Sequence, residues 1–180
     1  MSKLRETFLD QLMDIYDAEK QLTKALPKAA KAAEHEELRS AIETHLEETE
    51  EHVERLERVF ETIDESAKGK KCAAMAGLVE EANEGIKEKL GDAAMICAAQ
   101  KIEHYEIASY GCLVTWARIL GEDEAADILE ETLDEEKDTD DKLTSLAESI
   151  INEEESEGEG EEEEERGRSR ISSSSKSSRS

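Results

Sequence analysis

The stretch AAQKIEHYEIASYGCL (Ala98–Leu113) contains the pattern that decides the fold. Steps of three and four residues follow one face of an α-helix here, through Ala99, Glu103, Glu106, Tyr110 and Leu113. The apolar residues at both ends of this series indicate a face that packs against other helices, although two carboxylates interrupt it. We expect the helix that contains this stretch to span Asp92–Leu120.

Three further stretches have the same period and predict long helices over Leu4–Ala33, Glu36–Asp64 and Asp123–Ile151. Aromatic residues make up 3% of the chain and Pro27 is its one proline, a composition that argues against a β-sandwich or barrel. Pro27 falls inside the first stretch, where a proline is expected to kink or split a helix. The predicted fold class is all-α.

The connections between these helices predict their arrangement. Short links near Glu34 and Gly121 make each pair of consecutive helices antiparallel neighbours. The connection from Glu65 to Gly91 is long enough to cross back along the molecule, and Met75–Leu90 is expected to form a short helix within it. Two hairpins joined by one long crossover form a ferritin-like four-helix bundle. We expect this bundle over residues 1–152 and a disordered tail, acidic and then rich in Ser and Arg, over residues 153–180.

The charge of the chain limits its partners. There are 48 acidic and 23 basic residues, which gives a net charge of −25. Such a chain repels phosphates, so neither a nucleic acid nor an anionic membrane is an expected partner. There is no secretory signal and no long apolar run, and Cys72, Cys97 and Cys112 form no close pair in the sequence. These features predict a cytoplasmic protein with reduced thiols.

Acidic residues interrupt the apolar faces of the other helices as well. Glu19 interrupts the first face, while Glu136 and Asp140 interrupt the last. The second helix has His45 and His52 at equivalent positions. The pattern predicts a polar layer to which all four helices contribute.

The interruptions fall at one depth in the predicted bundle. Glu19 and Glu48 lie 15 and 14 residues from the turn near residue 34, while Glu106 and Glu136 each lie 15 residues from the turn near residue 121. In helices of about 30 residues these positions are midpoints. A shared depth is difficult to explain by chance, even in a chain this acidic.

Buried carboxylates without cationic partners are costly, and Lys and Arg are scarce on these faces. Two divalent cations would neutralise four carboxylates, and oxygen ligands with an imidazole suit iron or manganese. We therefore expect a two-metal centre with ligands drawn from Glu19, Glu48, His52, Glu103, Glu106, Glu136 and Asp140. His45 and Tyr110 are expected either to bind the metals or to contact the ligands. A structural layer of polar or protonated side chains is the alternative.

The sequence resembles a known family, the YciE/YciF family of ferritin-like stress proteins. The resemblance covers about residues 1–150 and is most specific in EHYEIASYG, within the stretch quoted above. Its other segments are DAEKQLTKALPKAAKAA (Asp17–Ala33), HLEETEEHVERLERVF (His45–Phe60) and TLDEEKDTDDKL (Thr132–Leu143). The resemblance implies a ferritin-like four-helix fold, a homodimer, a di-iron centre and a link to the stress response.

These observations predict a di-iron or dimanganese carboxylate protein that reacts with dioxygen or hydrogen peroxide, as a ferroxidase or peroxidase does. Two alternatives remain open. The first is a non-enzymatic helical stress protein whose acidic layer is structural, and the second is peroxide decomposition of the manganese-catalase kind.

Overall fold

The computed structural model is all-helical, as predicted. Its elements are α1 (Lys3–Ala32), α2 (Glu36–Thr62), α3 (Ala73–Glu88), α4 (Asp92–Leu120) and α5 (Asp123–Ser174). The structure describes the backbone of residues 2–174 and the side chains of residues 2–150, and it contains no strand within that backbone. The sequence predicts a disordered tail over residues 153–180, but the backbone of α5 is helical through Ser174, and residues 175–180 lie outside the described residues.

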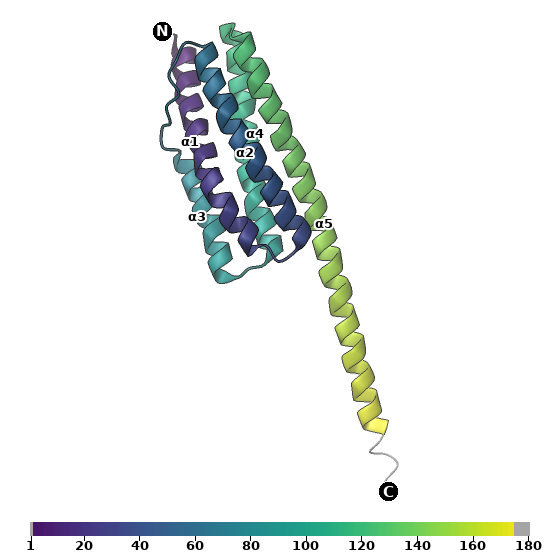
Figure 1. Ribbon diagram of the computed structural model, residues 1–180. Helices are drawn as coiled ribbons and strands as arrows, with labels where there is room; N and C mark the ends of the chain where they lie inside the picture. Colours follow the sequence, from purple (N-terminus) through teal and green to yellow (C-terminus); the bar gives the residue numbers. More distant parts are fainter. Residues whose placement is uncertain (1, 175–180) are drawn as a thin grey trace.

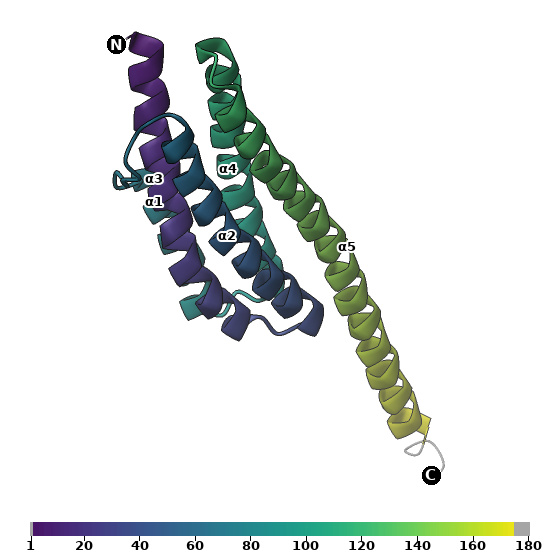
Figure 2. The same ribbon diagram turned by 45° about the horizontal axis from the view of Figure 1, so that its top comes forward.

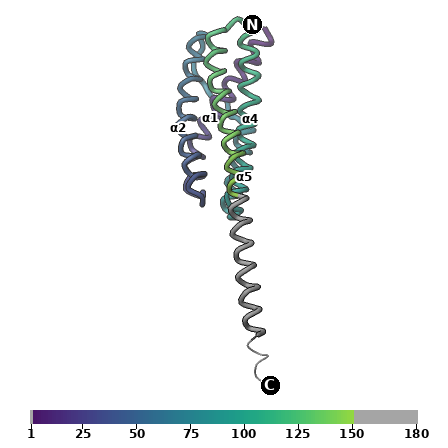
Figure 3. The backbone as a smooth tube through the Cα atoms, turned by 90° about the vertical axis from the view of Figure 1, so that its right-hand side faces the viewer, coloured from purple at the N-terminus to yellow at the C-terminus, as the bar shows by residue number. Residues whose placement is uncertain are grey.

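The four long helices α1, α2, α4 and α5 lie side by side (Figures 1 and 3). α1 packs on α2 and α4, and α5 packs on the same two helices. The α1–α2 and α3–α4 turns meet at one end, while the N-terminus and the α4–α5 turn lie at the other (Figure 2). The consecutive helices α1 and α2, and likewise α4 and α5, are therefore antiparallel, as their short links predict.

The helix boundaries agree closely with those expected from the periodicity. α4 ends at Gly121, which adopts a left-handed conformation with φ 77°. Residues with a side chain rarely adopt this φ, which explains why a glycine stands at this position. The expected split at Pro27 does not occur, since α1 continues through this residue. Packing on both sides of a proline can keep a helix continuous at the cost of one backbone hydrogen bond.

The long crossover carries the expected short helix, α3, which packs on the outside of α1 and α4. The segment that precedes it is bound to α1. The Lys70 amide donates a hydrogen bond to the Met13 carbonyl at 2.9 Å, and the Cys72 amide donates one to Asp17 Oδ2 at 2.8 Å. These bonds fix where α3 begins.

A buried carboxylate joins the α1–α2 turn to the start of α4. Asp92 accepts hydrogen bonds from the backbone amides of Glu34 and His35, at 3.0 and 2.7 Å, and lies 2.8 Å from His35 Nδ1. Burial alone would raise the pKa of Asp92, but these hydrogen bonds hold it below its ordinary value.

The apolar core is divided into two clusters. The first lies toward the α4–α5 turn and includes Phe8, Leu12, Phe60, Leu113 and Leu129. The second lies toward the α1–α2 turn and includes Leu38, Ile42, Ile96, Leu143 and Ile150. On α2, α4 and α5 the buried His and Glu residues fall between members of these clusters, so the polar layer lies inside the protein.

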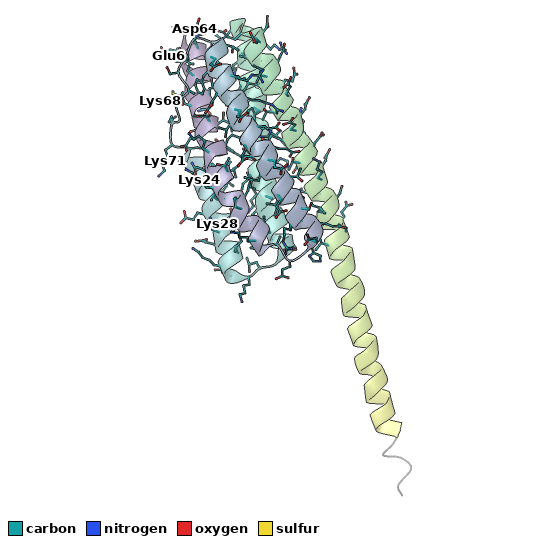
Figure 4. The ribbon with its side chains drawn as sticks, viewed as in Figure 1. Glu6, Lys24, Lys28, Asp64, Lys68 and Lys71 are labelled. Atoms are coloured by element: carbon teal, nitrogen blue, oxygen red, sulfur yellow. The ribbon has the colours of Figure 1, made fainter. Side chains whose placement is uncertain are left out.

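The outer surface is covered by charged side chains. Lys24 and Lys28 on α1, and Lys68 and Lys71 on the crossover, project away from the helices (Figure 4). Within the described part of the chain, no helix combines the length and apolar composition needed to span a bilayer.

The three cysteines of the described chain are free, with Cys72 buried and the other two exposed, as expected of reduced thiols.

Candidate metal centre

Two groups of buried side chains, which share one residue, could each hold a metal ion. The first consists of His45, Glu103, Glu106 and Glu136, and the second of Glu19, His52 and Glu136. Within each group the ligand atoms lie within 4.8 Å of one another. All four long helices contribute, and Glu136 of α5 belongs to both groups. These side chains could hold two adjacent cations with Glu136 as a shared carboxylate.

Helical spacing directs these side chains to one place. Glu103 and Glu106 are three residues apart on α4 and therefore share a face. His45 and His52 are seven residues apart on α2, which is two helical turns. Glu19, Glu106 and Glu136 have no exposed surface, and Glu103 is 2% exposed. The predicted layer of acidic side chains at one depth is therefore present in the structure.

His52 is held from the outside of the layer. Its Nε2 atom lies 2.8 Å from Glu135 Oε2, and its Nδ1 atom lies 3.2 Å from Glu136 and 3.6 Å from Glu19. Arg55 donates two hydrogen bonds to Glu135, at 2.5 and 2.8 Å. A carboxylate on the outer nitrogen of a metal-binding histidine directs the other nitrogen toward the ion. The Glu135–Arg55 pair is suited to that role.

His45 lies between Glu103 in the polar layer and Glu48 at the edge of that layer. Its Nε2 atom lies 3.3 Å from Glu103, and its Nδ1 atom lies 3.6 Å from Glu48. Glu48 is half-buried and lies 3.8 Å from Lys142 Nζ. The nearby His45 imidazole holds the pKa of Glu48 below its ordinary value. Glu48 therefore contacts a member of the first group without belonging to that group.

Tyr110 contacts the opposite side of the layer. Its hydroxyl is buried and donates a hydrogen bond of 2.5 Å to Glu19 Oε1. Burial and the neighbouring carboxylates raise the pKa of Tyr110 well above its ordinary value, so the phenol keeps its proton. The structure thus places Tyr110 as a hydrogen-bond donor to a candidate ligand.

Many polar atoms of this layer have no hydrogen-bond partner. Among the described residues, all but one of the buried side-chain atoms without a partner belong to Glu19, His45, His52, Glu103, Glu106 and Glu136. Natural proteins rarely leave buried polar atoms unpaired, and such a concentration needs an explanation. Four carboxylates and two imidazoles match the charge and ligand preference of two divalent iron or manganese ions. The residues present therefore fit a two-metal centre.

Without cations, burial and mutual repulsion disfavour the ionised form of these carboxylates. Burial raises the pKa of Glu103 and Glu106 well above the ordinary value, and the charges of neighbouring carboxylates raise it further. Burial also raises the pKa of Glu19. The layer as it stands must bind either protons or cations.

Two residues expected as ligands lie outside both groups. Asp140 lies 3.3 Å from His104 Nε2 and 3.4 Å from Gln100 Nε2, and Glu48 lies at the edge described above. Conversely, Glu135 and Arg55 were not predicted from the sequence. Their only signal was position, because Glu135 adjoins Glu136 and Arg55 follows His52 by three residues.

The matching family model is a domain of unknown function, DUF892, and it covers residues 3–156. Escherichia coli (strain K12) protein YciF is 52% identical over 157 residues, which are 84% of this chain and 95% of YciF. The chain belongs to the YciF family. The resemblance to this family that was inferred from the sequence is thereby confirmed.

Three solved structures are similar to this one over most of the chain. The crystal structure of the E. coli stress protein YciF matches with a TM-score of 0.81 and 51% identity, over 84% of this chain and 99% of that one. YcfI of Rhodopseudomonas palustris, which has been suggested to be a structural protein, matches with a TM-score of 0.77 and 41% identity, over 79% of this chain and 94% of that one. A protein from Xanthomonas campestris matches with a TM-score of 0.67 and 29% identity, over 83% of this chain and 94% of that one.

Proposed function

We propose that this YciF-family member is a ferritin-like stress protein with a two-metal carboxylate centre, of iron or manganese, that reacts with dioxygen or hydrogen peroxide. The observation that carries the proposal is the set of buried, unpaired oxygen and nitrogen atoms from all four long helices. Their donor chemistry suits these two metals. The order of the helices, two antiparallel pairs joined by a crossover, supports the ferritin-like assignment.

The two groups assign a role to each residue. Glu19 and His52 would hold one ion, and His45, Glu103 and Glu106 would hold the other, while Glu136 would be shared. Glu135 and Arg55 would orient His52, and Tyr110 would fix Glu19. When bound, the metals supply the electrons that reduce dioxygen or peroxide. The protein supplies the geometry, the charge balance and a buried set of ligands.

Metal stoichiometry tests this proposal. The protein is loaded anaerobically with ferrous iron, passed through a desalting column and analysed for iron by emission spectrometry. We expect two ions per chain and rapid oxygen consumption when the loaded protein is exposed to air. Manganese is tested in parallel, with hydrogen peroxide as the oxidant. A stoichiometry near zero with both metals would overturn the proposal.

A structural role is the second candidate, and the description of the R. palustris relative favours it. In that case the carboxylates would remain partly protonated and would stabilise the fold through hydrogen bonds among themselves. The double variant Glu19→Gln and Glu136→Gln separates the candidates. A structural layer would tolerate the two amides with no change in metal content, whereas a metal centre would lose its ions.

A further inference from the structure

A large cavity lies directly beside the candidate metal centre. Its volume is about 860 Å³, and residues of all five helices line it. His45 and Glu103 of the first metal group form part of its wall. Interiors of proteins are normally close-packed, and cavities of 300–1,000 Å³ are typical of ligand sites. The position and size of this cavity therefore point to a small molecule.

The wall of the cavity is mostly apolar. Leu26, Met95 and Leu146 pack against the second core cluster, yet they are only partly buried and line the cavity. Small residues such as Ala82 on α3 and Ala99 on α4 leave the space open. An engineered apolar cavity of about 150 Å³ holds one benzene ring, so this volume accommodates on the order of 30 non-hydrogen atoms. The bulk of the occupant is accordingly hydrocarbon.

A few polar groups mark the end of the cavity that faces the centre. Thr139 lines the wall, is 6% exposed, and its Oγ1 atom is buried without a hydrogen-bond partner. A helical threonine normally bonds to the carbonyl one turn earlier, so an unpaired hydroxyl here is available to a ligand after a change of rotamer. His45, a candidate metal ligand, lines the same end, with its Nε2 atom 3.3 Å from Glu103. The Thr139 hydroxyl beside it is suited to an oxygen-bearing group.

The charge around the cavity favours a neutral occupant. Glu36, Glu37 and Glu48 line it near the surface, and Lys142 is the one Lys or Arg among its described lining residues. Lys142 already lies 3.8 Å from Glu48. A carboxylate or phosphate in this position would be repelled both locally and by the net charge of −25.

We propose that this cavity binds a neutral, largely hydrocarbon molecule with one oxygen-bearing end, such as an alcohol or an alkyl hydroperoxide, and that this end lies against Thr139 and the metal centre. The apolar chain occupies the space between α1, α3, α4 and α5. The proposal rests on the proposed function, because it names the substrate class of the same centre. We take the occupant to be a small molecule and not a protein surface, because the wall includes His45, Glu103 and Thr139, which are buried between helices.

The cavity is tested first in metal-free protein, with the neutral fluorophore N-phenyl-1-naphthylamine as the probe. We expect saturable binding of one probe per chain. 1-Decanol should displace it at concentrations at least about tenfold lower than decanoate, which has the same chain length and a charge. Absence of saturable binding, or equal displacement by both compounds, would overturn the proposal.

Two variants locate the binding. Ala99→Phe and Ala82→Phe fill the cavity from α4 and from α3, and each should weaken probe binding by at least about tenfold. Ala108→Phe is the matched control, because Ala108 lies on the exposed face of α4, and it should bind the probe as the unmodified chain does. Two blocking variants are used so that one that fails to fold does not decide the result. If the folded blocking variant binds like the control, the cavity is not the site.

The contact with the metal centre is tested by spectroscopy. Cobalt(II) is loaded as a coloured substitute, and 1-decanol is added. We expect a shift of the visible cobalt bands in the unmodified chain and none in Ala99→Phe, while an unchanged spectrum with bound decanol would refute the proposed orientation. Failure to load cobalt would count against the metal centre alone, because the fluorescence measurement decides separately whether the cavity binds a neutral apolar molecule.

Discussion

A single carboxylate, Glu136, determines how the two candidate metal sites are coupled. It belongs to both groups, whereas Glu19 belongs to one. We therefore expect Glu136→Gln to reduce iron content from two ions per chain to fewer than one, and Glu19→Gln to reduce it to about one. Metal analysis after anaerobic loading measures both. Asp138→Asn, two residues away and exposed, is the control and should retain two ions. Equal losses in the two Gln variants would argue against a shared ligand.

The contact between His52 and Glu135 leads to a second prediction. Glu135→Gln keeps the size of the side chain but removes the charge that holds the outer nitrogen of His52 and pairs with Arg55. Loss of such a partner typically weakens metal binding about 10–100-fold. Competition with a chromophoric chelator measures the affinity. Asp134→Asn is the control, because Asp134 is exposed and pairs with Lys137 on the surface. If both variants bind metal equally, Glu135 has no positioning role.

At the scale of the elements, Asp92 is the residue that holds two helices to a third. Asp92→Ala would leave the backbone amides of Glu34 and His35 without their buried carboxylate acceptor. We expect the free energy of unfolding to fall by about 2–4 kcal/mol. Urea denaturation monitored by circular dichroism measures this change. Glu124→Ala, in the exposed first turn of α5, should cost a few tenths of a kcal/mol. A similar loss in both variants would show that the contact is not important.

Replacement of Pro27 in α1 is expected to stabilise the protein, in contrast to replacement of Asp92. The helix continues through it, so the proline removes one backbone hydrogen bond without ending the element. Pro27→Ala should therefore raise the midpoint of thermal unfolding, by the equivalent of about 1–3 kcal/mol. Differential scanning calorimetry measures the midpoint, and Lys24→Ala, one turn earlier and exposed, serves as the control. A lower midpoint in Pro27→Ala would mean that the pyrrolidine ring makes packing contacts that outweigh the lost bond.

The long helices and their pairing were predictable because periodicity and link length are local properties of the sequence. The polar layer was predictable too, since Glu19, Glu106 and Glu136 interrupt apolar faces at matching depths. Residues at the edge of a face were not predictable. A small rotation of a helix decides whether Glu48 or Asp140 points inward, and that rotation depends on packing between helices. In a chain with 48 acidic residues, Glu135 has no distinguishing sequence feature.

For the molecule as a whole, the balance between protons and cations in the polar layer determines how stability depends on pH. Burial opposes protonation of His45, but Glu103 and Glu48 outweigh it and raise the pKa to about 9 from the ordinary 6.5. Burial raises the pKa of Glu103 and Glu106 as well. All these raised values mean that the folded, metal-free protein binds more protons than the unfolded chain. Its stability therefore decreases as pH rises through the folded-state pKa values.

Between pH 6.5 and pH 9, the window for His45, the metal-free protein should lose on the order of 1–3 kcal/mol of stability. With manganese bound the dependence should reverse, because the ligands must lose protons before they bind the ions and bound ions stabilise the folded state. Urea denaturation at several pH values, with a chelator and with excess Mn²⁺, measures both curves. His45→Gln should reduce the slope of the metal-free curve in this window. The slope that remains comes from the other groups with raised pKa values, among them His52, whose burial is outweighed by its contacts with Glu136 and Glu19, which raise its pKa to about 11. A metal-free protein that becomes more stable toward pH 9 would mean that its buried carboxylates are already neutralised by contacts within the chain, and the physical reason for two cations at this centre would then be lost.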